Sequence, residues 1–84
     1  MLELFQVEDS PQCARVRRKM SEMMLDFVAR QVGPDPERRT RLKLASGQTG
    51  VPALVDPDNG MVVTEADDII AYLEEAHSHP KATP

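Results

Sequence analysis

Ser10 and Cys13 are the two side chains of this sequence best placed to do chemistry. They stand three residues apart in Ser-Pro-Gln-Cys, where a short apolar run ends and a helical pattern begins. The N-terminus of a helix presents free N–H groups and the positive end of the helix dipole, which stabilise an anion and lower the pKa of a thiol. Ser10 either caps the helix or donates its hydroxyl to an anion. Cys13 is either a reactive thiol or a small buried apolar residue.

The elements that must position these residues alternate between strand and helix. Residues 2–7 form an apolar run that is typical of a strand buried on both faces. Apolar residues then recur at helical spacing to about position 23, and residues 25–32 predict a second, more exposed strand. Asp35 as cap and Pro36 at the first position predict one helix that runs to about Ala45.

The second half of the sequence predicts a hairpin and a last helix. Residues 53–55 and 61–63 flank the turn Asp-Pro-Asp-Asn-Gly. Thr64 is expected to start the helix, with Asp67 completing a capping box. The expected buried face of this helix consists of Ile69, Ile70, Leu73 and Ala76. The order β-α-β-α-β-β-α predicts an α/β domain with a four-stranded mixed sheet flanked by three helices.

Length, charge and cysteine count exclude several function classes. The chain has 84 residues, one cysteine and a formal net charge of −4. This length allows one domain, which we expect over residues 1–77, with residues 78–84 as a flexible tail. The negative charge argues against nucleic acid as a partner, and no apolar stretch approaches the ~18 residues of a membrane span. With no signal-peptide pattern and no internal disulfide, we expect a cytoplasmic protein.

Other charged residues offer weaker signals. The basic clusters at 15–19 and 38–43 are either solvated helix faces or a local positive field beside a small anionic ligand. His77 and His79 are separated by one residue near a proline, without cysteines or carboxylates at ligand spacing. The sequence therefore predicts no metal site.

Three motifs carry a family resemblance. Segment 10–17, Ser-Pro-Gln-Cys-Ala-Arg-Val-Arg, resembles the Cys-Pro-x-Cys-x-Arg-Val-Arg opening of glutaredoxins and cysteine-bearing glutathione transferases, with serine replacing the first cysteine. Segment 46–52 looks like the glutaredoxin segment that ends in Val-cis-Pro before the third strand. Segment 65–73 is similar to the transferase pattern Glu-Ser-x-x-Ile-x-x-Tyr-Leu, with alanine replacing the serine. Together they resemble a thioredoxin fold of the glutaredoxin and glutathione S-transferase N-terminal type.

The resemblance implies roles for the two candidate catalytic residues. Ser10 occupies the position of the exposed cysteine nucleophile, and Cys13 that of the resolving cysteine, so a dithiol mechanism cannot run within this chain. Some glutathione transferases use a serine at the matching turn to donate a hydrogen bond to the glutathione thiolate. Capping by Ser10 and burial of Cys13 remain the alternatives.

The same resemblance implies a glutathione-binding frame. The backbone of Val51, before a cis Pro52, would pair with the cysteinyl part of the ligand like an added strand; an ordinary trans turn is the alternative. Gln48 would contact the glycine carboxylate, or else is a solvent-exposed amide. Glu65, Ala66 and Asp67 would offer backbone N–H groups of the last helix to the γ-glutamyl carboxylate.

These interpretations predict a glutaredoxin-like glutathione-binding protein, with thiol–disulfide exchange as the family's implied activity. The expected ligand or co-substrate is glutathione, and the expected partners are glutathione or glutathionylated protein thiols. One alternative is a non-catalytic thioredoxin-fold adaptor whose groove receives a protein partner. Another is a stand-alone glutathione S-transferase N-terminal-like domain that uses Ser10.

Overall fold

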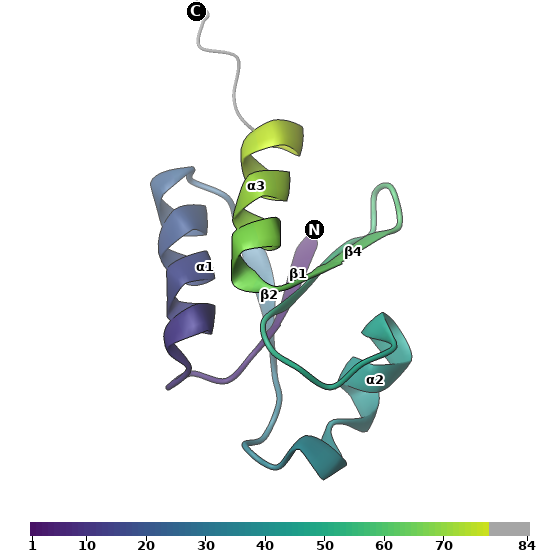
Figure 1. The fold of residues 1–84 in the computed structure, drawn as a ribbon. Helices are drawn as coiled ribbons and strands as arrows, with labels where there is room; N and C mark the ends of the chain where they lie inside the picture. Colours follow the sequence, from purple (N-terminus) through teal and green to yellow (C-terminus); the bar gives the residue numbers. More distant parts are fainter. Residues whose placement is uncertain (78–84) are drawn as a thin grey trace, which may run out of the picture.

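The computed structural model describes residues 1–77, apart from the side chain of Arg38. The expected tail at 78–84 and the second histidine, His79, lie outside the described residues. The elements along the chain are β1 (Leu2–Gln6), α1 (Pro11–Glu22), β2 (Phe27–Gln31), the 3-10 helix η1 (Pro36–Arg38), α2 (Thr40–Ser46), β3 (Ala53–Asp56), β4 (Met61–Thr64) and α3 (Ala66–Ala76) (Figure 1).

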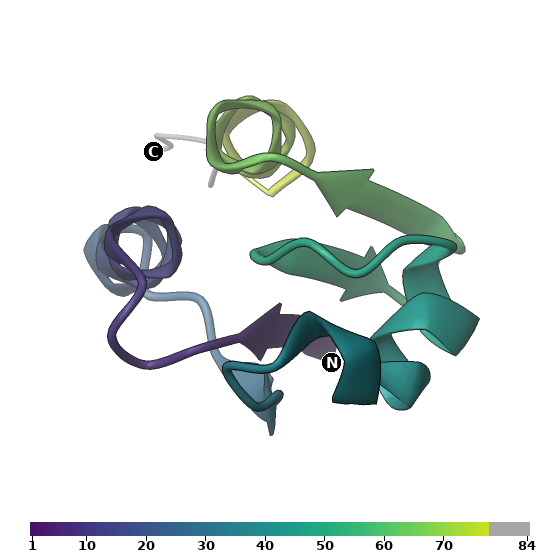
Figure 2. The ribbon, with the colours of Figure 1, turned by 60° about the horizontal axis from the view of Figure 1, so that its bottom comes forward.

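The four strands form one mixed sheet in the order β2-β1-β3-β4. β1 and β2 are parallel, whereas β3 is antiparallel to both β1 and β4. Helices α1 and α3 lie side by side over one face of the sheet, and α2 covers the other face (Figure 2). The predicted thioredoxin-like fold class, with its four-stranded mixed sheet, is confirmed.

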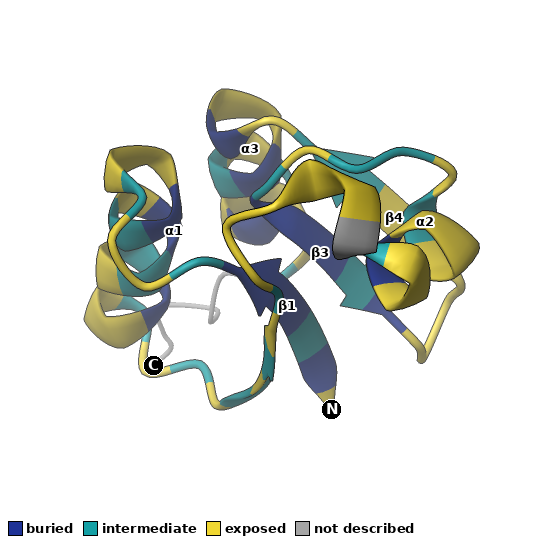
Figure 3. Cartoon of the chain, turned by 90° about the horizontal axis from the view of Figure 1, so that it is seen from below, coloured by how far each residue is buried: buried dark blue, intermediate teal, exposed yellow. Residues whose placement is uncertain are grey.

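β1 is buried on both faces because it lies between two apolar layers. Leu2 and Leu4 face the larger core under α1 and α3, while Phe5 faces a smaller core under α2. The buried residues of β1 and β3 occupy the middle of the molecule, and the outer surfaces of the helices are exposed (Figure 3). The larger core contains Leu2, Leu4, Val16, Met20, Leu54, Ala66, Ile69 and Leu73.

The prediction of one continuous helix after Asp35 is wrong at its centre. Asp35 does cap a helical turn, since its carboxylate accepts a hydrogen bond from the Glu37 amide at 3.0 Å. That turn is the 3-10 helix η1, which ends at Arg39, where φ is −92° and ψ is 49°. These dihedral angles leave the α-helical region, so α2 begins afresh at Thr40. α2 then ends at Gly47, which adopts the left-handed conformation expected of a helix C-cap.

The predicted capping box of the last helix is also wrong. Thr64 belongs to β4, where it pairs with Ala53 of β3, so it is held in the sheet. The chain turns from strand to helix within Glu65, which has a φ of 75° and makes no side-chain capping bond. Within α3 the buried residues are Ala66, Ile69 and Leu73, whereas Ala76, expected in the core, is exposed. The register of β4 therefore decides where α3 begins.

Among residues 1–77, no helix is long and apolar enough to span a membrane.

Candidate functional site

Three chain segments leave the sheet at one edge. Phe5 of β1 is paired with Ala53 of β3, which is paired in turn with Thr64 of β4. Since neighbouring strands lie about 4.7–4.9 Å apart, Phe5 and Thr64 are about 10 Å apart. The β1–α1 turn, the Val51-Pro52 step and the start of α3 therefore meet at this edge, which we call the three-segment edge. It brings together the segments that the sequence predicted to form a binding site.

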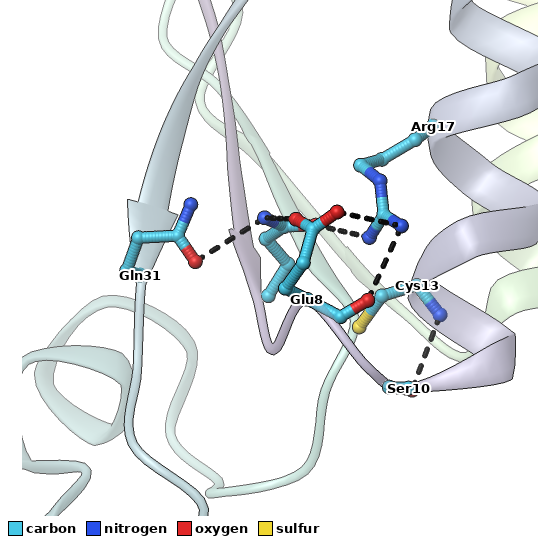
Figure 4. Close-up of polar contacts among 6 residues, drawn as sticks. Glu8, Ser10, Cys13, Arg17 and Gln31 are labelled. Atoms are coloured by element: carbon cyan, nitrogen blue, oxygen red, sulfur yellow. Dashed lines mark hydrogen bonds and ion pairs between the residues drawn. The ribbon is translucent and has the colours of Figure 1, made fainter.

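Ser10 is the N-cap of α1, with Pro11 in the first helical position. Its Oγ accepts a hydrogen bond of 3.3 Å from the backbone amide of Cys13 (Figure 4). Capping uses a lone pair of the oxygen, so the hydroxyl hydrogen stays available for donation. Within the described residues, the Ser10 hydroxyl accepts this one hydrogen bond and donates none. Capping and donation to an anion are therefore compatible at Ser10.

Cys13 lies in the first turn of α1, and its side chain is fully buried. Of the two alternatives that the sequence left open for Cys13, the structure shows the buried side chain. Of Ser10 and Cys13, Ser10 is the one that reaches the surface, where it is half-buried. A hydroxyl, and not a thiol, is thus the side-chain group that α1 presents at the three-segment edge.

A buried amide fixes the turn that carries Ser10. Gln6, at the end of β1, is 1% exposed, and its Oε1 accepts a 2.5 Å hydrogen bond from Arg17 of α1. Its Nε2 donates to Gln31 of β2 and to the carboxylate of Glu8, both at 3.2 Å (Figure 4). The Arg17 guanidinium also donates to the carbonyl of Glu8 at 3.3 Å. This network joins β1, β2 and α1 and sets the path of the β1–α1 turn.

The Val51–Pro52 peptide bond is cis, as the sequence predicted. Pro52 is buried, and Val51 packs against the smaller core. Within residues 1–77, neither the amide nor the carbonyl of Val51 makes a hydrogen bond. Backbone groups left unpaired beside a sheet can pair with an extended peptide as an added strand.

Gln48 holds its own loop. Its Oε1 accepts a 2.6 Å hydrogen bond from the amide of Gly50, and its Nε2 donates to the carbonyl of Gly50 at 2.9 Å. The second Nε2 hydrogen points to the hydroxyl of Ser46 at 3.3 Å. Both amide hydrogens are thereby engaged, so contact with a ligand carboxylate requires Gln48 to release one of these bonds.

The start of α3 supplies the third segment. Glu65 is exposed and has a positive φ, a conformation uncommon outside glycine, and such backbone strain is often found at functional sites. Ala66 is 4% exposed. Asp67 is exposed and forms an ion pair with Arg15 of α1, which links the first turns of the two helices. The first-turn N–H groups of α3 have no partner within the helix and remain open to an anion.

Comparison with known protein families decides the identity of this fold. The family model of the glutathione S-transferase N-terminal domain matches residues 4–81. The chain belongs to this family. No curated protein matches the chain.

Solved structures of similar fold include proteins from a plant, a bacterium and a protozoan. Rice GST1 in complex with glutathione is 31% identical, with a TM-score of 0.77. The match covers 90% of this chain and 33% of the rice protein. Glutaredoxin 2 of Salmonella typhimurium in complex with glutathione is 19% identical, with a TM-score of 0.79 over 100% of this chain and 37% of that chain. The trimeric glutathione transferase of Leishmania is 24% identical, with a TM-score of 0.78. That match covers 94% of this chain and 17% of the Leishmania protein. This chain thus spans well under half the length of each of these three proteins.

A second polar cluster lies at the other end of β3. Asp56 is 2% exposed, and its Oδ2 accepts a 2.7 Å hydrogen bond from the hydroxyl of Tyr72. The Nε2 of His77 lies 2.7 Å from the same oxygen, and the amide of Asp58 donates to Oδ1 at 3.2 Å. Burial alone would raise the pKa of Asp56, but these hydrogen bonds outweigh it and hold the pKa below its usual value. The cluster ties the end of α3 to the β3–β4 turn.

A cavity of about 660 Å³ lies apart from the three-segment edge. It follows η1 and α2 and reaches Thr49, but Ser10, Val51 and Glu65 do not line it. Among the described residues, no group of three or more His, Cys, Asp or Glu side chains could hold a metal ion.

Sequence reasoning missed the residues that act through long-range contacts. Arg17 was part of a basic cluster, and Tyr72 part of a motif, with no partner assigned to either. A polar residue at the end of a buried strand, such as Gln6, is the signal that could have revealed the first network, because a buried amide needs partners.

Proposed function

We propose that this domain binds glutathione, free or joined to a protein thiol as a mixed disulfide, at the three-segment edge. The observation that carries the proposal is the convergence there of a free hydroxyl hydrogen on Ser10 and unpaired backbone groups on Val51. The family match supports it, and two of the similar structures are glutathione complexes.

Each segment has a distinct task in this proposal. Val51 pairs its amide and carbonyl with the cysteinyl residue of the tripeptide, as a strand would. The first-turn amides of α3, at Ala66 and Asp67, donate hydrogen bonds to the γ-glutamyl carboxylate, and the carboxylate of Glu65 suits the γ-glutamyl ammonium group. Ser10 then donates its hydroxyl to the sulfur. Gln48 shapes the loop that delivers Val51, and releases a bond if it contacts the glycine carboxylate.

Glutathione brings its own thiol to this site, and the thiolate is the nucleophile it supplies. Ser10 stabilises the thiolate by a charge-assisted hydrogen bond, at a helix end whose dipole also favours negative charge. Cys13 takes no direct part because its side chain is fully buried. The activity that this arrangement serves best is activation of the glutathione thiol, more than exchange through a cysteine of the domain. A single buried thiol suits a reducing compartment such as the cytoplasm.

Titration of the domain with glutathione tests the proposal. We expect saturable binding, with amide chemical shifts that change at Ser10, Val51 and Ala66. The bound thiol should have a pKa below the ~8.5 of an ordinary thiol, measured from the ultraviolet absorbance of the thiolate. Ser10→Ala should raise that pKa, while Ser10→Thr, which keeps the hydroxyl, should not.

Two further variants separate donation from capping. Ser10→Asp retains a good N-cap acceptor but has no hydrogen to donate when ionised, so stability should persist and the thiol pKa should rise. Ser21→Ala, at an exposed serine near the end of α1, should change neither property. If the domain shows no saturable binding of glutathione, the proposal is wrong and the protein-binding adaptor becomes the better account.

A further inference from the structure

Arg39 makes an unusual set of hydrogen bonds for a residue in a basic cluster. It lies at the junction of η1 and α2, and its guanidinium donates to three backbone carbonyls. Nε donates to Gly33 at 2.9 Å, Nη1 to Thr49 at 2.8 Å, and Nη2 to Pro34 at 3.4 Å. One side chain therefore joins the segment that follows β2 to the loop that precedes β3.

That loop ends at Val51. Two residues before it, the carbonyl of Thr49 is fixed by Arg39. The remaining polar contacts of the loop are local: Gln48 bonds to Gly50 and Ser46, and the Gly47 amide bonds to Lys43. Among the described residues, no side chain from outside residues 46–50 other than that of Arg39 hydrogen-bonds to this loop.

We infer that Arg39 is a positioning residue for the glutathione site, acting through Thr49 on the backbone of Val51. The inference rests on the proposed function. Arg39 does not need to touch the ligand, because its donors are already directed at protein carbonyls. Its effect is to hold the Val51 amide and carbonyl where an added strand must meet them.

The geometry of the guanidinium explains why this position needs arginine. Its donors form a planar, rigid fork that reaches carbonyls in different directions at once. The ammonium of lysine is a compact point charge at the end of a flexible stem, so it keeps the charge but cannot hold the same three carbonyls. If Arg39 instead acted by attracting an anionic ligand, lysine would replace it well.

The test compares Arg39→Lys and Arg39→Gln with Arg41→Gln. Arg41 lies two residues further along, in α2, and is exposed, so its substitution removes the same charge without touching the loop. We expect both Arg39 variants to bind glutathione about tenfold more weakly, equivalent to about 1.4 kcal/mol, and Arg41→Gln to bind like the parent. The loss should be the same at low and high salt.

A second measurement separates positioning from overall stability. Amide hydrogen exchange at Gly50, whose amide is hydrogen-bonded to Gln48, should be faster in both Arg39 variants, while exchange in the buried strand β1 should be unchanged. Normal affinity in Arg39→Lys with loss in Arg39→Gln would show that charge matters and would overturn the inference. Global unfolding of both variants would also overturn it, by making Arg39 a general stability residue.

Failure of the proposed function has a different signature. If the parent domain binds no glutathione, the proposed function is wrong, whatever Arg39 does. The exchange rate at Gly50 then still shows whether Arg39 holds the loop. Unchanged rates in both variants would contradict the positioning role independently of any ligand.

Discussion

The backbone amide of Cys13 donates a 3.3 Å hydrogen bond to Ser10 Oγ, while the Cys13 side chain is fully buried. The two residues therefore play opposite parts at one turn. Ser10 reaches the surface and caps the helix, and Cys13 faces the interior. The position of the exposed cysteine in the related redox motif carries a hydroxyl here, so in the proposed function the reacting thiol is that of the ligand.

The burial of Cys13 predicts slow modification. In the native state, a bulky thiol reagent should label Cys13 only as fast as the domain opens, whereas the denatured chain should be labelled at once. Stopped-flow or absorbance measurements with and without denaturant give the two rates. Rapid stoichiometric labelling of the native domain would instead reveal an activated nucleophile, if the labelling rate reaches half its maximum at a pH well below the ~8.5 of an ordinary thiol.

The cluster around Asp56 predicts an acid-sensitive fold. Because hydrogen bonds hold the folded-state pKa of Asp56 below the unfolded value of about 3.9, Asp56 stabilises the fold above that value. This stabilisation is lost as the pH falls from about 4 through the folded-state pKa. Urea unfolding between pH 7 and pH 2.5 measures the loss, which Asp56→Asn should diminish. Asp58→Asn, at an exposed neighbour, should leave the pH dependence unchanged.

Tyr72 should account for much of that effect. Tyr72→Phe removes one hydrogen bond to a buried carboxylate and should lower the free energy of unfolding at pH 7 by about 1–3 kcal/mol. The same variant should lose less stability than the parent on acidification, because its Asp56 has a less depressed pKa. If the parent and Tyr72→Phe lose the same amount of stability on acidification, the Tyr72 hydroxyl does not act on Asp56 and Tyr72 contributes only packing.

Much of the fold could be predicted from the sequence because local signals set it. Ser10 and Pro11 mark the start of α1, and Gly47 marks the end of α2, as caps that each need a specific residue type. The apolar run of β1 correctly predicted a strand buried on both faces. These features depend on residues within one turn of the chain.

Two errors in the predicted fold, the unbroken helix after Asp35 and the start of the last helix at Thr64, have non-local causes. The helix after Asp35 breaks at Arg39, whose side chain is held by carbonyls at positions 33, 34 and 49. The start of α3 is fixed by the pairing of Thr64 with Ala53 across the sheet. Neither contact has a signature in the local pattern. For the bond between Arg17 and Gln6, the local pattern signals only that Gln6 needs a partner, and not that the partner is Arg17.

The family resemblance assigned the three segments to one binding site, but their spatial relationship depends on strand register. The motifs placed Ser10, Val51 and Ala66 on the right turns. That these turns share one edge follows from the pairing of Phe5, Ala53 and Thr64, which the sequence alone does not specify.

Ala66 stands where the related transferase pattern has a serine, which predicts a gain of affinity on restoring it. Ala66→Ser should add a hydrogen bond to a charged carboxylate, worth about 1.5–3 kcal/mol, and so tighten glutathione binding by at least tenfold. Calorimetric titration measures the change. Ala71→Ser makes the same substitution at an exposed position of α3 and should not alter affinity. Unchanged affinity in Ala66→Ser would place the γ-glutamyl carboxylate elsewhere.

Ser10→Cys tests whether the three-segment edge retains a redox-competent frame. The new thiol would take the surface position at the N-terminus of α1, with Cys13 one turn behind it as resolving partner. The helix dipole, together with the cation of Arg15, should lower its pKa below ~8.5. We expect the variant to form an internal disulfide and to reduce disulfides with glutathione, with much lower activity in the parent.

The control for this variant is the double substitution Ser10→Cys with Cys13→Ala. It keeps the surface thiol but cannot close an internal disulfide, so it should accumulate the mixed disulfide with glutathione, which mass spectrometry detects. A folded Ser10→Cys variant that closes its disulfide yet exchanges nothing with glutathione would have a working thiol pair beside an edge that does not hold the tripeptide. In that outcome Val51 and Ala66 do not form a glutathione site, and binding of a protein partner is the better account of what the domain does.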